Sequence, residues 1–517
     1  MRAQPHSQAS SDPNLHSRPH SVFDELKSLL KHTSAYGAGN LISKFVGLLL
    51  VPFYTHYLTP ADIGTLELLD LSVALLGLAI MMWMSSSVIR YYYEYDDRKN
   101  KDEIISTVLI TASILGGIAS TCGILFCRQF SSLILKSPVY YKYFWVLSIT
   151  FWFTTLNSVS FSYLRAKQRS GLVSTINVIT MSLSLCLNIY FIAIVRTGVI
   201  GILYSSLISN SLSATILTFF TIREIHLGFS FAKLKALARF GAPLIITSFC
   251  AFALNFSDRF FLGKFTNLSV VGVYALGYKF AFMLSFLLVQ PFDMIWTSRM
   301  YEVAKRPNGV SLFSRIFRYY SLVLTAAALG ISLIIKDAIG ILATPPFRDA
   351  YKIVPVVALA YIFQGSYRFI VGGIYIKKKT SSVGLISAAS LALNLLLNYL
   401  LIPRFAGKGA AWATVLSFSF MAGYAYFVTE KVYPVSYQVG SFFLAIAVAA
   451  ALYLCAIKVS IPSAILSAGF KVLLFISFPF VLYLVGFFKE DELKKAKQAM
   501  QSLWATRRWG SAVLPEQ

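Results

Sequence analysis

Residues 437–456 read YQVGSFFLAIAVAAALYLCA and contain no charged side chain over twenty positions. A helix that crosses a lipid bilayer needs roughly 20 mostly apolar residues, and similar runs recur along the whole chain with short polar breaks between them. The composition agrees, because 57% of the residues are hydrophobic and 13% are charged, whereas a soluble domain carries about 25% charged residues. The sequence therefore predicts a membrane protein.

Fourteen such segments lie between Thr33 and Phe488 and leave no room for a soluble domain. They must be helices, because irregular backbone or an open sheet cannot face lipid. The fold class predicted is an all-α polytopic bundle of 14 transmembrane helices. The predicted spans are 33–54, 66–88, 105–126, 143–164, 172–194, 200–221, 239–262, 272–295, 313–335, 353–376, 382–401, 407–428, 437–456 and 464–487.

Lysine and arginine residues predict the orientation of the bundle. With a cytoplasmic N-terminus, about 30 of the 46 basic residues fall on the inner side and about 11 on the outer side, as the positive-inside rule requires. Residues 165–169 and 377–379 are two strongly basic inner loops. Both ends are therefore predicted to be cytoplasmic. The net charge of +24 is spread over the inner loops rather than gathered in one patch, so it does not indicate a nucleic-acid partner.

The polar ends of the chain predict two cytoplasmic tails. Residues 1–32 are rich in Pro, Ser and His, which is typical of partial disorder. They also lack the apolar core of a signal peptide, so we expect the first span to remain uncleaved. Residues 489–517 mix apolar side chains such as Trp504 with Lys and Arg. That pattern suits an amphipathic helix on the inner leaflet, or a plain solvated tail.

The cysteine and histidine residues indicate no cofactor chemistry. The five cysteines lie in or beside apolar spans without a pairing pattern and behave as small hydrophobic residues. The six histidines form no metal-ligand spacing. We expect neither a metal site nor a cofactor.

The chain repeats itself after about six spans. The separation from Lys167 to Asn188 equals that from Lys377 to Asn398, and each pair is followed by a glycine-containing turn, at 198–201 and at 407–409. The first spans of the two halves match more weakly, with 36–38 parallel to 240–242 and 58–64 parallel to 268–272. Because six is an even number, both copies have the same orientation in the membrane and are related by an axis along its normal.

The repeat predicts two pseudo-symmetric six-helix lobes with a cavity between them. The domains expected are a tail at 1–32, an N-lobe at 33–221, a cytoplasmic linker at 222–238, a C-lobe at 239–428, two further helices within 429–488, and the C-terminal tail at 489–517.

Four motifs stand out along the chain: YLTPADIGTL at 57–66, FGAP at 240–243, NFSDRFFL at 255–262 and NLLLNYLLIPRFAGKGAAWAT at 394–414. Together they resemble the polysaccharide transporter family, the Wzx-type O-antigen and exopolysaccharide flippases. That family belongs to the superfamily that also holds the lipid II flippase and the MATE drug extruders. The resemblance covers about residues 33–488, and the polar N-terminal extension departs from it.

The resemblance implies a MATE-like fold and a flippase rather than an enzyme. The implied substrate is an undecaprenyl-pyrophosphate-linked oligosaccharide, moved from the inner to the outer leaflet of the bacterial inner membrane for O-antigen (lipopolysaccharide) or exopolysaccharide synthesis. Further implied partners are membrane lipid, a coupling ion (proton or sodium), and a polysaccharide polymerase that would receive the product.

Such a substrate needs a polar and preferably cationic cavity, because unsatisfied polar groups in hydrocarbon cost about several kcal/mol each. Charged side chains within spans usually face the interior of a bundle and are candidates for that role. The candidates for substrate binding are Lys44, Arg368, Lys279, Asn40, Gln364 and Arg259. The candidates for ion coupling are Asp70, Asp258 and Glu67, and Asp293 lies further along the span of Lys279.

Several of these residues have a second interpretation that involves no ligand. Arg368 could extend its side chain to the inner interface. Asp258 and Arg259 could form a local structural pair. Glu67 and Asp70 could cap the outer end of their helix at the interface.

Two other functions remain open on the sequence. A MATE-type multidrug extruder for cationic drugs would favour an acidic cavity by Coulomb attraction, whereas Lys44, Lys279 and Arg368 make the deep charges lean basic. A membrane enzyme such as a polymerase or ligase would need a substantial outer loop. No outer loop exceeds about 20 residues, and no nucleotide-binding motif appears.

Overall fold

The computed structural model describes Gly47, residues 50–459 and residues 461–488. These residues form helices and no strand. The α-helices are α2 (Val51–Tyr57), α3 (Pro60–Gly77), α4 (Trp83–Glu94), α5 (Arg98–Leu125), α6 (Cys127–Leu135), α7 (Tyr141–Ala166), α8 (Ser170–Ile189), α9 (Val199–Glu224), α10 (Phe231–Phe265), α11 (Leu268–Leu284), α12 (Gln290–Ala304), α13 (Gly309–Leu342), α14 (Val354–Ile370), α15 (Gly372–Ile376), α16 (Thr380–Val432), α17 (Val439–Lys458) and α18 (Ala464–Leu484). The π-helical segments are η1 (Leu78–Met82), η3 (Tyr190–Ile194) and η4 (Ser285–Val289), and the 3₁₀ helices are η2 (Pro138–Tyr140) and η5 (Pro345–Lys352).

The membrane architecture predicted from hydropathy is confirmed. Within the described residues, 12 helices are long and apolar enough to cross a membrane. One of them, α16, has 53 residues and is interrupted by non-helical backbone at Ala406, so its two arms correspond to the predicted spans 382–401 and 407–428. The predicted span 33–54 lies almost wholly outside the described residues. The total of 14 therefore stays a prediction.

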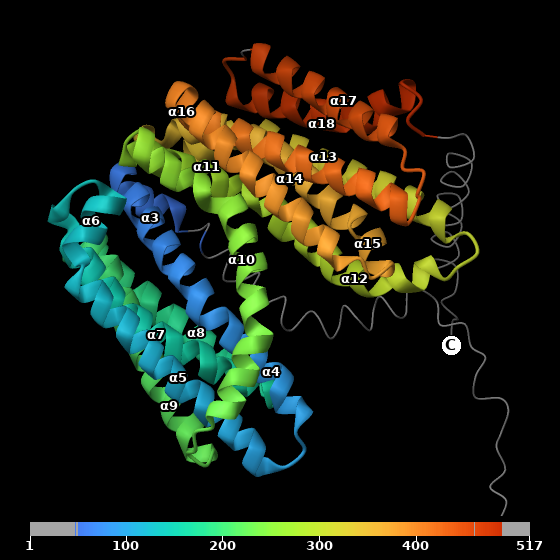
Figure 1. Ribbon diagram of the computed structural model, residues 1–517. Coiled ribbons are helices and arrows are strands. Elements are labelled where there is room, and N and C mark those ends of the chain that lie inside the picture. Colours follow the sequence, from blue (N-terminus) through green and yellow to red (C-terminus); the bar gives the residue numbers. More distant parts are fainter. Residues whose placement is uncertain (1–46, 48–49, 460, 489–517) are drawn as a thin grey trace, which may run out of the picture.

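The helices form two lobes. Figure 1 shows the blue-to-green helices α3 to α9 in one lobe and the yellow-to-orange helices α11 to α16 in the other, with the red helices α17 and α18 along the far side of the second lobe. α3 and α11 pack against each other where the lobes meet. α17 and α18 pack on α13 and on each other. The lobe boundaries expected from the sequence stay a prediction.

Helix α10 runs from one lobe to the other (Figure 1). Its first half packs on α4, where the Ser87 hydroxyl donates to the carbonyl of Leu237 at 3.1 Å, and its second half packs on α11 and α16. The linker expected at 222–238 is therefore mostly helical, and only residues 225–230 separate α9 from α10. Those residues are fixed to α5, because Ser106 and Thr107 accept backbone N–H groups of Gly228 and Ser230.

Capping groups decide where the helices begin, which hydropathy does not detect. The span predicted at 66–88 starts at Pro60, because Thr59 and Asp62 form a reciprocal capping box. The Thr59 hydroxyl accepts the Asp62 N–H, and the Asp62 carboxylate accepts the Thr59 N–H at 2.9 Å. This box satisfies two of the free N–H groups of the first turn. The cap of α3 is thus made by Thr59 and Asp62, and Glu67 lies two turns further along the helix.

The backbone repeats itself at the positions that the sequence repeat matched. Gln168 and Lys378, each one residue after a matched lysine, have φ angles of 56° and 58°. Each turn is closed by the same bond, from Arg169 N–H to the Leu164 carbonyl and from Lys379 N–H to the Ile374 carbonyl. In addition, α3 and α11 each continue into a five-residue π-helical segment, η1 and η4. These matches support the parallel repeat.

Candidate functional site

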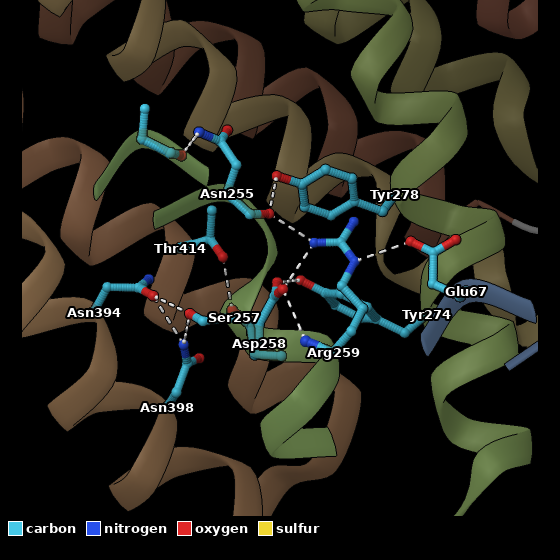
Figure 2. Close-up of polar contacts among 12 residues, drawn as sticks. Glu67, Asn255, Ser257, Asp258, Arg259, Tyr274, Tyr278, Asn394, Asn398 and Thr414 are labelled. Atoms are coloured by element: carbon cyan, nitrogen blue, oxygen red, sulfur yellow. Dashed lines mark hydrogen bonds and ion pairs between the residues drawn. The ribbon is translucent and has the colours of Figure 1, made fainter. Parts of the chain in front are cut away.

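Five of the candidate residues stand on α3, α10 and α11, which pack against one another where the lobes meet. α3 contributes Glu67 and Asp70, α10 contributes Asp258 and Arg259, and α11 contributes Lys279. Figure 2 shows Glu67 reaching toward Arg259 from one side, while Tyr274 and Tyr278 of α11 flank the guanidinium.

Arg259 is buried and is contacted by several of the described residues. Its Nη1 donates to the Asp258 carboxylate and to the Asn255 carbonyl, both at 2.7 Å. Its Nε lies 3.4 Å from Oε1 of Glu67, and its guanidinium lies 3.8 Å from the centre of the Tyr278 ring. Only 2% of Arg259 is exposed. This candidate for substrate binding is therefore inaccessible to a ligand in this conformation.

Asp258 is the main counter-ion of Arg259. Besides Nη1, it accepts the Arg259 N–H at 3.0 Å and the Tyr274 hydroxyl at 2.5 Å, and it is 3% exposed. Burying a charge is costly unless the charge is paired and hydrogen-bonded, and these contacts meet that condition. The structure thus favours the structural-pair interpretation of Asp258 and Arg259 over an exposed site.

Glu67 connects the two lobes. It stands on α3, whereas Arg259 stands on the half of α10 that packs in the other lobe, and 27% of the Glu67 side chain is exposed. Its distance from Arg259 Nε is that of an ion pair without a hydrogen bond, and the buried Nε has no hydrogen-bond partner within the described residues. Glu67 is therefore the looser of the two carboxylates that hold Arg259.

Asp70 and Lys279 are exposed, although the residues beside them in the chain are buried. The charged neighbours of Asp70 are Glu67 and Lys279, which come from opposite lobes. At a rise of about 1.5 Å per residue, Asp70 and Lys279 each lie about 10 Å along their helices from Gly64 and Gly272, where α3 and α11 touch. Both side chains are therefore exposed on the two helices through which the lobes contact each other.

Gln364 links the cluster to the interior of the second lobe. Its amide donates to Oδ1 of Asn255 at 3.1 Å, and its Oε1 lies 3.5 Å from the Ser285 hydroxyl. It is 8% exposed. A separate buried network of Ser257, Asn394 and Asn398 lies on the other side of α10 (Figure 2). Gln364 thus stabilises the packing around Arg259 and has little surface to offer a ligand.

Arg368 differs from Arg259 in its accessibility. It stands one helical turn after Gln364 on α14 and pairs with Asp293 of α12 at 3.3 Å. The side chains of Arg368 and Asp293 are 51% and 30% exposed. The structure does not bring Arg368 into the Arg259 cluster, so the two arginines belong to separate sites. Asn40 and Lys44 lie outside the described residues.

Sequence reasoning missed Tyr274 and Tyr278, whose rings pack against Arg259. Their spacing of four residues puts both on one face of α11, and this regularity was the available signal. It was hidden among the 29 tyrosines of the chain.

The family described as "Polysaccharide biosynthesis protein" matches residues 55–352. The chain belongs to this family. The matched residues include Arg259 and its partners Glu67, Asp258 and Tyr278, whereas Gln364 and Arg368 lie beyond them. A protein of Haemophilus influenzae named "Uncharacterized membrane protein" is 27% identical over 272 residues, which are 51% of this chain and 63% of that protein. The chain thus spans less than two thirds of the length of that relative.

Two solved structures have a similar fold. The lipid II flippase MurJ in an inward closed conformation matches with a TM-score of 0.73 and 13% identity, over 86% of this chain and 98% of that one. An inward-facing MATE multidrug resistance transporter matches with a TM-score of 0.62 and 16% identity, over 74% of this chain and 93% of that one. The MATE-like fold expected for this member of the polysaccharide biosynthesis family is confirmed.

Proposed function

We propose that the protein is a flippase that carries an undecaprenyl-pyrophosphate-linked oligosaccharide across the bacterial inner membrane by alternating access. Its N- and C-termini would both be cytoplasmic, and the glycan would serve O-antigen or exopolysaccharide synthesis. Membership in the polysaccharide biosynthesis family supports this class of substrate. The proposed activity is transport, with no bond made or broken, and a polymerase would use the product.

The observation that carries the proposal is the exposed ion pair of Arg368 with Asp293 inside the membrane region. An exposed pair of this kind contributes about 0–1 kcal/mol, so a multiply charged pyrophosphate can displace Asp293 from Arg368. Arginine also offers a fork of N–H groups that fits phosphate oxygens. Lys279 is an accessible cation of the same lobe, and Lys44 and Asn40 are proposed to complete the cavity from the other lobe.

The buried candidates have a supporting role in this proposal. Arg259 and Gln364 would hold the cavity wall in shape, because their partners leave them nearly inaccessible. Among the acidic residues, Asp70 is exposed and Glu67 is partly exposed, so these two are the better candidates for a coupling proton or sodium ion. Asp258 is bound to Arg259 and would stay paired.

The test is glycan display in a flippase-null strain. Lys44→Ala and Arg368→Ala should each abolish surface glycan at normal protein levels. Lys44→Arg should retain part of it, and Arg368→Lys should retain less because the fork is lost. Lys352→Ala is the matched control, since Lys352 pairs with the nearby Asp349 outside the spans. Full glycan display by the double alanine variant would disprove the proposal.

A multidrug extruder is the second candidate, and the fold shared with a MATE transporter supports it. Drug susceptibility of the same strain separates the two functions. An extruder would raise drug resistance and leave the glycan unchanged.

A further inference from the structure

α3 and α11 touch each other through two glycines. A Cβ atom on Gly64 would lie 1.9 Å from the carbonyl oxygen of Leu268, and a Cβ atom on Gly272 would lie 1.9 Å from the carbonyl oxygen of Pro60. Pro60 and Leu268 are the first residues of α3 and α11. The backbones of the two helices are therefore in direct contact within their first two turns.

The contact is reciprocal. Each glycine stands four residues after the start of its own helix, and each meets the first carbonyl of the other helix. A two-fold axis produces such an arrangement, because each partner presents the same patch to the other. The lobes thus meet on the axis that relates the two repeats, at the end where α3 and α11 begin.

Other contacts between the lobes lie at this same end. The Thr344 hydroxyl donates to the carbonyl of Thr55 at 2.7 Å, and Nζ of Lys136 lies 3.4 Å from the carbonyl of Thr266. In Figure 1, the lobes converge at α3 and α11 and diverge toward the opposite end of the molecule. The glycine contact therefore lies at the end where the lobes converge, which we call the closed end.

We propose that Gly64 and Gly272 form the closing contact of a gate at this end. The lobes can approach this closely only because both positions lack a side chain. The atoms opposite them belong to the backbone, so no change of rotamer would relieve an overlap. A methyl group at either position would keep the lobes apart and favour conformations that are open at this end. Such a gate would set the conformational equilibrium whatever substrate the protein carries.

Cross-linking of the closed end tests the proposal without any substrate. The five native cysteines are replaced by alanine, and Thr55→Cys and Thr344→Cys are introduced, since these residues join the lobes at the closed end. A short bifunctional thiol reagent then reports how often this end is closed. With both glycines intact, the cross-link should form readily. In Gly64→Ala and in Gly272→Ala, its rate should fall on the order of tenfold as the population shifts.

Gly423→Ala is the matched control, because a Cβ atom there meets nothing within 4 Å. Cross-linking rates equal to this control would overturn the proposal. If neither alanine variant folds, Gly263→Ala is used for the same cross-linking test. The Cβ atom of this variant would lie 3.0 Å from a methyl group of Leu68 on the other lobe. Leu68 can adjust, so a smaller decrease in rate is expected, and no decrease would also overturn the proposal. Loss of glycan display is scored separately, so the two proposals fail independently.

Discussion

Removing the Asp258 carboxylate should destabilise the protein strongly. In Asp258→Ala, Arg259 loses its 2.7 Å bond to Oδ1 while it remains 2% exposed. The guanidinium would then keep its bond to the Asn255 carbonyl and the aromatic ring of Tyr278, and its nearest carboxylate would be Glu67 at 3.4 Å. Breaking a buried ion pair by removing one partner costs about 3–5 kcal/mol, because a buried charge is left uncompensated.

Two substitutions of neighbouring residues should destabilise the protein less than Asp258→Ala does. Tyr274→Phe removes the hydroxyl that donates to Asp258 at 2.5 Å, and a hydrogen bond to a charged group contributes about 1.5–3 kcal/mol. Glu67→Ala removes the outer carboxylate, which is 27% exposed and not hydrogen-bonded to Arg259, so about 1 kcal/mol is expected. The predicted order of destabilisation is Asp258→Ala, then Tyr274→Phe, then Glu67→Ala.

A double-mutant cycle in detergent measures the pair itself. Asp258→Ala, Arg259→Met and the double variant are unfolded by denaturant, and their free energies of unfolding are compared. Each variant should have a lower free energy of unfolding than the native protein. The decrease in the double variant should be smaller than the sum of the two single decreases by about 1–3 kcal/mol, since the double variant leaves no lone buried charge. Additive single effects, or a loss below 1 kcal/mol for Asp258→Ala, would refute the assignment of Asp258 as the counter-ion.

Three further predictions concern topology, the accessible pair and the break in α16. Ser381→Cys and Asn308→Cys should react with membrane-impermeant thiol reagents only from the cytoplasmic side, and labelling of both in intact cells would contradict the cytoplasmic N-terminus. Arg368→Ala should change the free energy of unfolding by less than about 1 kcal/mol, because its pair with Asp293 is half exposed. Ala406→Gly should raise it by about 1 kcal/mol, because Ala406 has a φ of 48° that favours glycine. Thermal or denaturant unfolding in detergent checks both values.

The sequence was sufficient for the fold because hydropathy alone identifies helices in lipid. It located the interior of each span but not its ends. Capping by Thr59 and Asp62 starts α3 six residues before the predicted span, and polar end turns of this kind lower the hydropathy signal. A short helix, α6, was also missed, because nine residues between two spans carry no transmembrane signal.

The sequence repeat aligns the glycine-containing turns 198–201 and 407–409, and the backbone adds one match beside them. Gly198 (φ 66°, ψ −138°) has the same conformation as Ala406 (φ 48°, ψ −129°), which stands one residue before the second turn. A search for matching glycines cannot find a position where one copy has alanine.

The identity of the charged residues was readable from the sequence, but their burial was not. Arg259 and Arg368 both stand within apolar spans on polar helix faces. Whether an arginine is enclosed depends on residues from other helices, here Glu67 and Tyr278 for Arg259. Those contacts arise only when α3, α10 and α11 pack together.

The position of Asp258 next to Arg259 has a consequence for movement of the lobes. Glu67 stands three residues after Gly64 on α3, so a separation of the lobes at the glycine contact also separates Glu67 from Arg259. That loss is small, because the pair is 3.4 Å apart and Glu67 is partly solvated. Asp258 and Tyr274 belong to the same lobe as Arg259 and move with it. If the proposed gate opens, the buried guanidinium therefore keeps its main counter-ion, and its charge would add little to the barrier between the closed and open conformations.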